Sequence, residues 1–169
     1  MADLTSVTRM MGVMAAAYPG FTISAETIRV YGRMLADIPD KLLEGAGMDC
    51  MARCRFFPTI AEIREAAYSI KLLQSGAPSA FEAWGEVSRL MAEVGSYRVP
   101  EFSHPWIATA VRQVGGWTRL CQSENSVADR ARFLDAYADA QRRDARQETT
   151  MPEVRQLAAR LALRPGARK

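Results

Sequence analysis

The stretch that decides the fold is Phe56-Phe57-Pro58-Thr59-Ile60-Ala61-Glu62-Ile63-Arg64, where one predicted helix ends and the next begins. Pro58 cannot continue a helix, because its ring removes a backbone donor and clashes with the preceding turn. Thr59 and Glu62 have the spacing of a capping box, in which both side chains bind free amides at a helix start. Apolar residues then recur at helical spacing, which predicts a helix with one buried face: Ile60, Ile63, Ala67 and Ile70.

Three more helices are predicted before this stretch, each with apolar residues three or four positions apart. Their predicted inner faces are Leu4-Val7-Met11-Met14-Tyr18, Ile28-Tyr31-Leu35-Ile38 and Leu43-Ala46-Cys50. Tyr18-Pro19-Gly20-Phe21 separates the first two helices, since Pro fixes φ and Gly permits positive φ. Ser24 is the predicted N-cap of the second helix, and Pro39 the first position of the third.

After the turn signal Gln74-Ser75-Gly76-Ala77-Pro78, a second capping box, Ser79 to Glu82, opens a further helical segment. Its predicted face is Phe81, Trp84, Val87 and Met91. Two short helices follow, one ending near Val114 and one over 117–121. The longest helix is predicted from a cap at Ser126 to about Arg146. Val127, Ala131, Leu134 and Ala138 line one side of it, with Phe133 and Tyr137 adjacent. A polar linker at 148–150 then precedes a last helix that opens at Pro152.

These patterns predict an all-α protein of two small helical bundles, joined by a short linker and followed by an amphipathic C-terminal helix. The predicted domains are residues 1–75, residues 76–147 and a C-terminal segment at 148–169. The formal net charge is +3, from 22 basic and 19 acidic residues. Residues 1–75 and 76–147 each balance to zero, so the whole excess lies in 148–169. That distribution argues against a DNA-binding body, which usually has a basic face.

Several protein classes are excluded by composition. No apolar run approaches the ~20 residues that span a bilayer, and the first residues lack the pattern of a signal peptide. Three cysteines in 169 residues do not make a disulfide framework. We therefore expect a protein of the reducing cytoplasm, with no membrane partner.

Catalytic motifs are missing from the sequence. It contains no GxxxxGK[ST], GxGxxG or GxSxG pattern, which argues against a nucleotide-cradling loop or a serine nucleophile. The single histidine, His104, fits a surface or capping role. Cys50, Cys54 and Cys121 would need His104 to complete a zinc site, and helical cysteines are more often small buried hydrophobes. We expect no enzyme activity, no cofactor and no metal site.

Residues 13–70 resemble the phage replicative helicase loader/inhibitor family. Three motifs in the same order carry the resemblance: 13–21 with its Tyr-Pro-Gly-Phe turn, 27–39 with Met34-Leu35-Ala36-Asp37-Ile38-Pro39, and Phe56 to Arg64. The chain departs from the family where Phe57-Pro58 replaces a double proline. The motif residues are expected to be mainly structural, with a share in a partner surface as the alternative: Tyr18, Pro19, Phe21, Met34, Leu35, Pro39, Phe57, Pro58, Thr59, Ile63 and Arg64.

Residues 81–137 resemble a second, uncharacterised phage helical module. Its pattern here is Trp84, then Gly95 and Tyr97, then Gly115-Gly116-Trp117, and finally Phe133 with Tyr137. The module has no known activity. Its pairing with the first resemblance favours a phage or prophage replication protein, which implies the cytoplasm of a bacterial host cell.

The first resemblance implies an adaptor that binds a hexameric DnaB-type helicase, holds it inactive and delivers it to an origin through an initiator protein. With no P-loop, any ATP hydrolysis would belong to the helicase. The predicted helicase-binding surface is on the last helix: Val154, Arg155, Leu157, Ala158, Arg160, Leu161 and Arg164. That helix has two alternatives, packing on its own bundle or a weak or indirect contact with DNA. The alternative reading of the whole chain is a small helical DNA-binding or regulatory protein of a phage.

Overall fold

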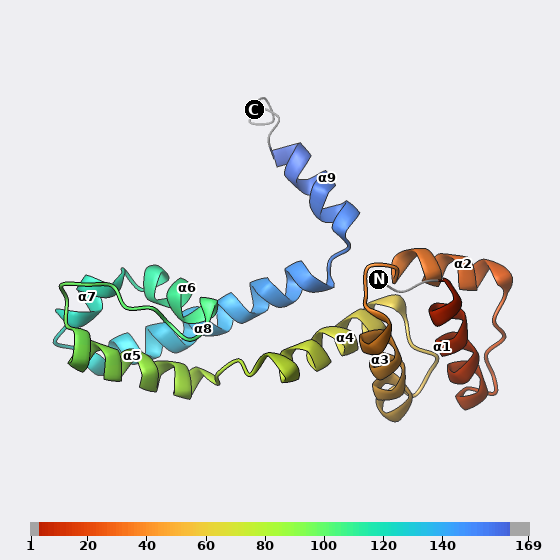
Figure 1. The fold of residues 1–169 in the computed structure, drawn as a ribbon, viewed down its shortest axis with the longest axis horizontal. Helices are drawn as coiled ribbons and strands as arrows, with labels where there is room; N and C mark the ends of the chain where they lie inside the picture. The colour runs from red at the N-terminus through yellow and green to blue at the C-terminus, as the bar shows by residue number, and fades with distance from the viewer. Residues whose placement is uncertain (1–3, 163–169) are drawn as a thin grey trace. The chain divides into compact units, whose positions relative to one another are not determined.

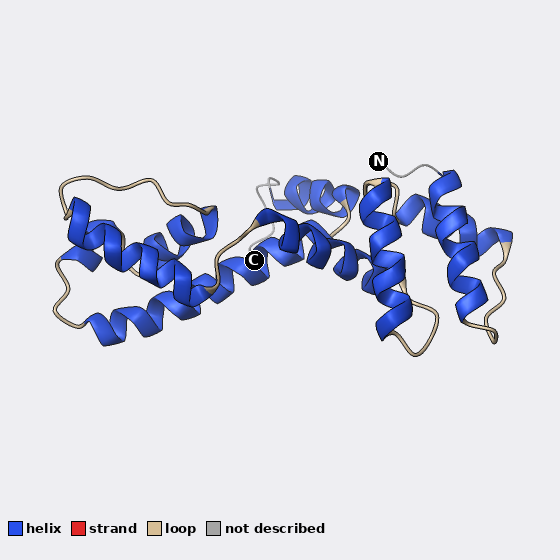
Figure 2. Cartoon of the chain, turned by 60° about the horizontal axis from the view of Figure 1, so that its bottom comes forward, coloured by secondary structure: helices blue, strands red, loops and turns tan. Residues whose placement is uncertain are grey.

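The computed structural model describes residues 4–162, and this part of the chain is helical with no strand (Figures 1 and 2). Its helices are α1 (Leu4–Ala17), α2 (Ala25–Met34), α3 (Asp40–Arg53), α4 (Ile60–Ser75), α5 (Ala80–Val94), α6 (Pro105–Gln113), α7 (Trp117–Cys121), α8 (Ser126–Thr149) and α9 (Pro152–Ala162). The predicted all-α class is confirmed.

The chain divides into two compact units. Unit 1 is Met1–Ser75 together with Gln147–Lys169, of which residues 4–75 and 147–162 are described. Unit 2 is Gly76–Arg146. The helix α8 therefore begins in unit 2 and has its last turn in unit 1, which makes the C-terminal segment part of the same unit as the N-terminal helices.

Unit 1 is built on an apolar core from α1, α3 and α4, closed by the residues that follow α2. The buried members are Val7, Met10, Met11, Met14, Leu35, Ile38, Leu43, Ala46, Cys50, Ile63, Ala66 and Ala67. Ser24 caps α2, its hydroxyl accepting from the Thr27 amide at 3.0 Å. The Thr59 and Glu62 capping box forms as predicted, because the Thr59 amide donates to Glu62 Oε2 and the Glu62 amide donates to Thr59 Oγ1.

Unit 2 buries four of its eight Phe, Trp and Tyr side chains. Its buried apolar residues are Ala83, Val87, Trp106, Ile107, Ala110, Val111, Val114, Trp117, Leu120, Phe133, Ala136, Tyr137 and Ala140. The second capping box, Ser79 with Glu82, is present at the start of α5. Phe81 does not face inward as predicted: it is 67 % exposed, and the Arg130 guanidinium lies 5.5 Å from its ring centroid.

Three local expectations about helix ends and faces are wrong. Asn125, not Ser126, caps α8, its Oδ1 accepting from the Ala128 amide at 3.0 Å. The helix then continues to Thr149, so the expected polar linker at 148–150 is mostly helical. Pro39 is the N-cap of α3 in extended backbone, one position before the predicted place.

The buried face of α8 also differs from the prediction. It is formed by Asp129, Phe133, Ala136, Tyr137 and Ala140, whereas Val127 is 79 % exposed. Periodicity permits both faces, since small and apolar residues occur around the helix. Packing selects the face with Phe133 and Tyr137, because these large rings remove the most apolar surface from water.

Candidate functional site

The turn motifs of unit 1 meet in one aromatic cluster. Phe21 stacks on Phe57 with ring centroids 4.0 Å apart, and Tyr18 and Tyr31 each meet the Phe57 ring edge-on. Pro58 is fully buried beside them. The Tyr-Pro-Gly-Phe turn and the Phe-Phe-Pro-Thr turn therefore pack against each other, which joins the ends of α1 and α3.

The two tyrosine hydroxyls satisfy carbonyls at helix ends. Tyr18 donates to the carbonyl of Cys54 at 3.0 Å, and Tyr31 donates to the carbonyl of Pro58 at 2.9 Å. Burial raises the pKa of the Tyr31 hydroxyl, with a smaller contribution from the Glu62 carboxylate. The hydroxyls stay protonated at neutral pH, so they remain donors to these carbonyls.

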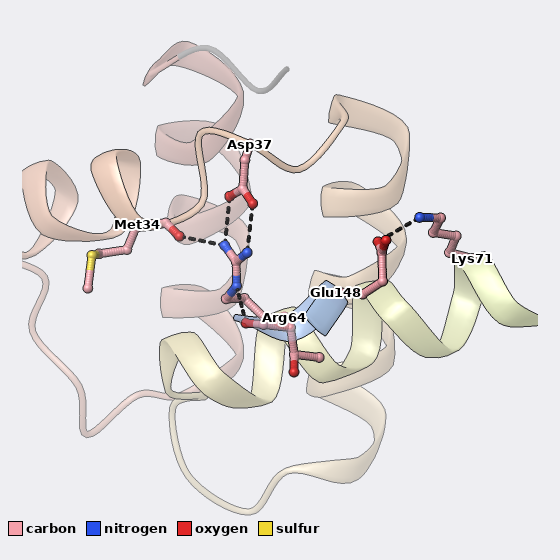
Figure 3. A network of polar contacts seen from close by, with 6 residues as sticks. Met34, Asp37, Arg64, Lys71 and Glu148 are labelled. Carbon is pink, nitrogen blue, oxygen red and sulfur yellow. Dashed lines mark hydrogen bonds and ion pairs between the residues drawn. The ribbon is translucent and has the colours of Figure 1, made fainter. Parts of the chain in front are cut away.

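Arg64 is the buried polar centre of the same unit, with 5 % of its side chain exposed (Figure 3). Its Nη1 and Nη2 atoms bind Asp37 Oδ1 and Oδ2 at 2.7 and 2.6 Å. Nη1 also donates to the carbonyl of Met34 at 2.9 Å, and Nε donates to the carbonyl of Thr149 at 2.8 Å. One guanidinium thus connects α2, α4 and the end of α8. It can do so because its N–H donors point in several directions in one plane.

Asp37 is the charge partner of this arginine. The hydrogen bonds from Arg64 hold the pKa of the Asp37 carboxyl below its usual value of 3.8, and Arg155 of α9 adds a smaller lowering. Asp37 belongs to the second family motif, but sequence reasoning did not single it out as a site residue. The available signal was an acidic residue at the end of the second predicted helix, together with Arg64 next to Ile63 of the predicted inner face.

The predicted binding residues on α9 lie on one exposed surface. Val154 is 51 % exposed, and Leu157 and Leu161 are each 57 % exposed. None of the residues of α9 is buried. Ala158 lies between the leucines, and Arg155 and Arg160 flank this apolar stripe. Arg164, also predicted for this surface, lies outside the described residues.

The remaining motif residues of unit 1 lie in its interior or in its turns. Leu35 and Ile63 are fully buried, and Thr59 is the N-cap side chain of α4. Pro19 is exposed in the turn between α1 and α2, and Pro39 is exposed at the start of α3.

The second phage pattern is assembled in the core of unit 2. Trp84 packs on Phe133 with centroids 5.3 Å apart, and the Tyr137 hydroxyl donates to the carbonyl of Pro78 at 2.5 Å. The Trp117 indole donates to the carbonyl of Gly95 at 2.9 Å. Tyr97 is the exception, because its side chain is entirely exposed in the loop after α5.

Two residues considered for catalysis or metal binding have structural roles: His104 caps a helix, and Cys50 is buried in the core. His104 is the N-cap of α6, its ring nitrogen accepting from the Trp106 amide at 3.3 Å. Cys50 is buried, and burial raises its pKa to about 12. Within residues 4–162, no group of three or more His, Cys, Asp or Glu side chains is arranged to hold a metal ion. In that same range, none of the helices has both the length and the apolar character of a membrane span.

An apolar groove between α1 and α3 was not predicted. Its volume is about 250 Å³, and it is lined by Arg9, Met10, Val13, Glu44, Gly47, Met48 and Met51. Met48 is 64 % exposed and does not belong to the predicted inner face of its helix. The nine methionines of the chain were the available signal, but periodicity alone does not separate a core face from an open groove.

Comparison with known proteins identifies the N-terminal segment. Residues 3–64 match the family model described as G39P, N-terminal domain. No curated protein matches the chain, and no solved structure matches it. The matched segment contains the aromatic cluster and ends at Arg64, so it covers the three motifs on which the resemblance was based. Residues 3–64 are therefore similar to the G39P N-terminal domain, and this match confirms the resemblance of the N-terminal part of the chain to the phage helicase loader/inhibitor family.

Proposed function

We propose that this chain is a phage or prophage replication adaptor that binds a hexameric DnaB-type helicase, holds it inactive and delivers it to an origin. An initiator protein would mark that origin, and the adaptor would have no ATPase of its own. The observation that carries the proposal is the match of residues 3–64 to the loader/inhibitor domain.

The exposed surface of α9 is the proposed helicase contact. A helix of ~12 residues is marginal alone in water, so α9 would gain stability from a surface that covers Leu157 and Leu161. An amphipathic helix laid in an apolar groove is a common recognition mode. Arg155 and Arg160 favour a groove with acidic side chains along its rim, which fits the concentration of positive charge in residues 148–169.

An adaptor without its own ATPase acts through differential affinity. It would bind one state of the helicase ring more tightly than another and so hold the ring in that state. A second ligand that favours the other state, namely ATP, DNA or the initiator, would then release it. The lack of a GxxxxGK[ST] motif agrees with a mechanism in which the helicase hydrolyses ATP and the adaptor does not.

Size-exclusion chromatography of the full chain with the hexameric helicase of its own phage or host tests the proposal. We expect co-elution that depends on ATP. Leu157→Glu should weaken the complex strongly, because it places a charge in the apolar contact. Leu73→Glu is the matched control, since Leu73 is also an exposed leucine, 84 % exposed, and belongs to a different helix, α4.

Two outcomes would contradict the proposal. Absence of a complex with and without ATP would exclude the adaptor function. Equal binding of the wild type and the Leu157→Glu variant would exclude α9 as the contact. Binding to random DNA that weakens steeply with salt would favour the DNA-binding alternative instead.

A further inference from the structure

We infer that Arg64 and Lys71 hold the last turn of α8 on the N-terminal domain, and that this clasp sets the position of the α9 binding surface. The clasp is defined as Arg64 and Lys71 of α4 with the Glu148 side chain and the Thr149 carbonyl of α8. The inference concerns how the proposed helicase contact is positioned, so its functional part rests on the proposed function.

In the first part of the clasp, the Arg64 side chain caps the C-terminal ends of two helices. Met34 is the last residue of α2 and Thr149 is the last residue of α8, and Arg64 donates to the carbonyls of both. Carbonyls in the last turn of a helix have no partner within that helix and form the negative end of its dipole. A buried guanidinium neutralised by Asp37 therefore satisfies two helix ends together.

The second part is an ion pair beside it. Lys71 Nζ lies 2.6 Å from Glu148 Oε2, and both side chains are about half exposed. Arg64 and Lys71 are seven residues apart on α4, so they lie on the same face two turns apart. Figure 3 shows Lys71 facing Glu148 next to the group formed by Arg64, Asp37 and Met34. A face of α4 thus receives two consecutive residues of α8.

These contacts join distant parts of the sequence. Arg64 and Thr149 are 85 residues apart, and Lys71 and Glu148 are 77 apart. The family match ends at residue 64, whereas the clasp adds a segment that lies outside it. Arg64 therefore has in this chain a partner that the matched domain by itself does not contain.

The clasp lies immediately before the proposed binding helix. Only Thr150 and Met151 separate α8 from α9. Two residues span at most about 7 Å when extended, so the start of α9 stays close to the Thr149 carbonyl. No residue of α9 is buried, so the clasp immediately before this helix contributes to its position on unit 1, together with the attraction between Arg155 and Asp37. Arg64 is in this sense a positioning residue for the surface formed by Leu157 and Leu161.

Charge reversal in the full-length chain tests the clasp. Hydrogen exchange of a peptide covering residues 146–156 is measured by mass spectrometry in Lys71→Glu, Glu148→Lys and the double variant. Each single variant should speed exchange about two- to fivefold, the range expected for an exposed ion pair, and the double variant should restore it. The matched control is the reversal of Arg89 and Glu93, an exposed pair 2.8 Å apart on α5.

The outcomes separate the clasp from the proposed function. Unchanged exchange in both single variants, or no recovery in the double variant, would overturn the clasp whatever the helicase does. If exchange responds as expected, helicase affinity should fall in the single variants and recover in the double variant. Unchanged affinity would overturn the positioning role. A wild type that binds no helicase, with exchange still responding, would overturn the proposed function and leave the clasp standing.

Discussion

Arg64, buried in unit 1, forms a bidentate ion pair with the partly exposed Asp37, both oxygens of which are bound at 2.7 and 2.6 Å. Arg64 is 5 % exposed and the Asp37 side chain is 30 % exposed. A buried arginine requires such a partner, because an unpaired buried charge is strongly destabilising. In this chain, the pair connects the motif at 27–39, which contains Asp37, to the motif that ends at Arg64.

Asp37→Asn should destabilise the folded protein by about 2 kcal/mol near neutral pH, since Arg64 loses its counter-charge. The pKa of Asp37 is lowered on folding, so its contribution is complete above the unfolded value of 3.8 and is lost as the pH falls through the lower folded value. The stability difference between variant and wild type, measured by urea unfolding, should therefore shrink below about pH 4. Glu26→Gln, which removes an exposed pair with Arg29, serves as the control. A difference that stays constant down to pH 2 would contradict this role of the carboxylate.

Truncation should separate α9 from the clasp. A chain that ends after Met151 keeps the Thr149 carbonyl and loses a helix with no buried residue, so its free energy of unfolding should change by less than about 0.5 kcal/mol. A chain that ends after Arg146 leaves the Arg64 Nε without its acceptor, and we expect a loss of about 1–2 kcal/mol. Urea unfolding followed by circular dichroism measures both. Equal stability of the two truncated chains would argue against the contact with Thr149.

Two glycines should respond oppositely to replacement by alanine. At Gly32 a new Cβ would lie 2.6 Å from Leu4 Cδ1, the far end of a side chain that is 56 % exposed and able to move. At Gly47 it would lie 2.8 Å from Met10 Cγ, which is in the middle of the side chain of a residue only 6 % exposed. Gly32→Ala should therefore be neutral or stabilising by up to about 1 kcal/mol through helix propensity. Gly47→Ala should be destabilising by about 1 kcal/mol or more through overpacking. Thermal unfolding of the two variants would refute this reasoning if both moved the same way.

Cys50 should resist alkylation in the native protein. Its pKa of about 12 and its exposure of 1 % leave ~10⁻⁴ of the thiol as reactive thiolate at about pH 8. Cys54, at the partly exposed end of α3, should react first with iodoacetamide. Peptide mass spectrometry reads out the sites, and the urea-unfolded protein, in which all cysteines should react, provides the reference. Modification of Cys50 as fast as Cys54 would show that α3 opens readily.

Local signals predicted the helices well because they act over a few residues. Ser24, the Thr59–Glu62 box and the Ser79–Glu82 box each bind amides of their own helix, so their sequences are sufficient to identify them. The cap of α8 was misplaced by one residue, since Asn125 and Ser126 are both good caps and only backbone geometry chooses between them.

The inner face of α8 and the open groove between α1 and α3 were not predictable by periodicity. For α8, the choice depends on which side meets Trp84 and Trp106, which are distant in sequence. For the groove, the exposure of Met48 depends on where α1 crosses α3. Both features depend on how the helices pack against each other, and the pattern of apolar residues in one sequence does not specify that packing.

The sequence by itself determined the helical class, most helix boundaries, the concentration of positive charge in residues 148–169 and the three motifs of the N-terminal domain. Caps, turns and apolar periodicity depend on residues a few positions apart, so they can be recognised directly in the sequence. Only the tertiary structure decided that Arg64 takes Asp37, the end of α2 and the end of α8 as partners, and that α9 stays exposed. A buried guanidinium needs acceptors from several directions at once, and a chain supplies them only after distant segments have come together.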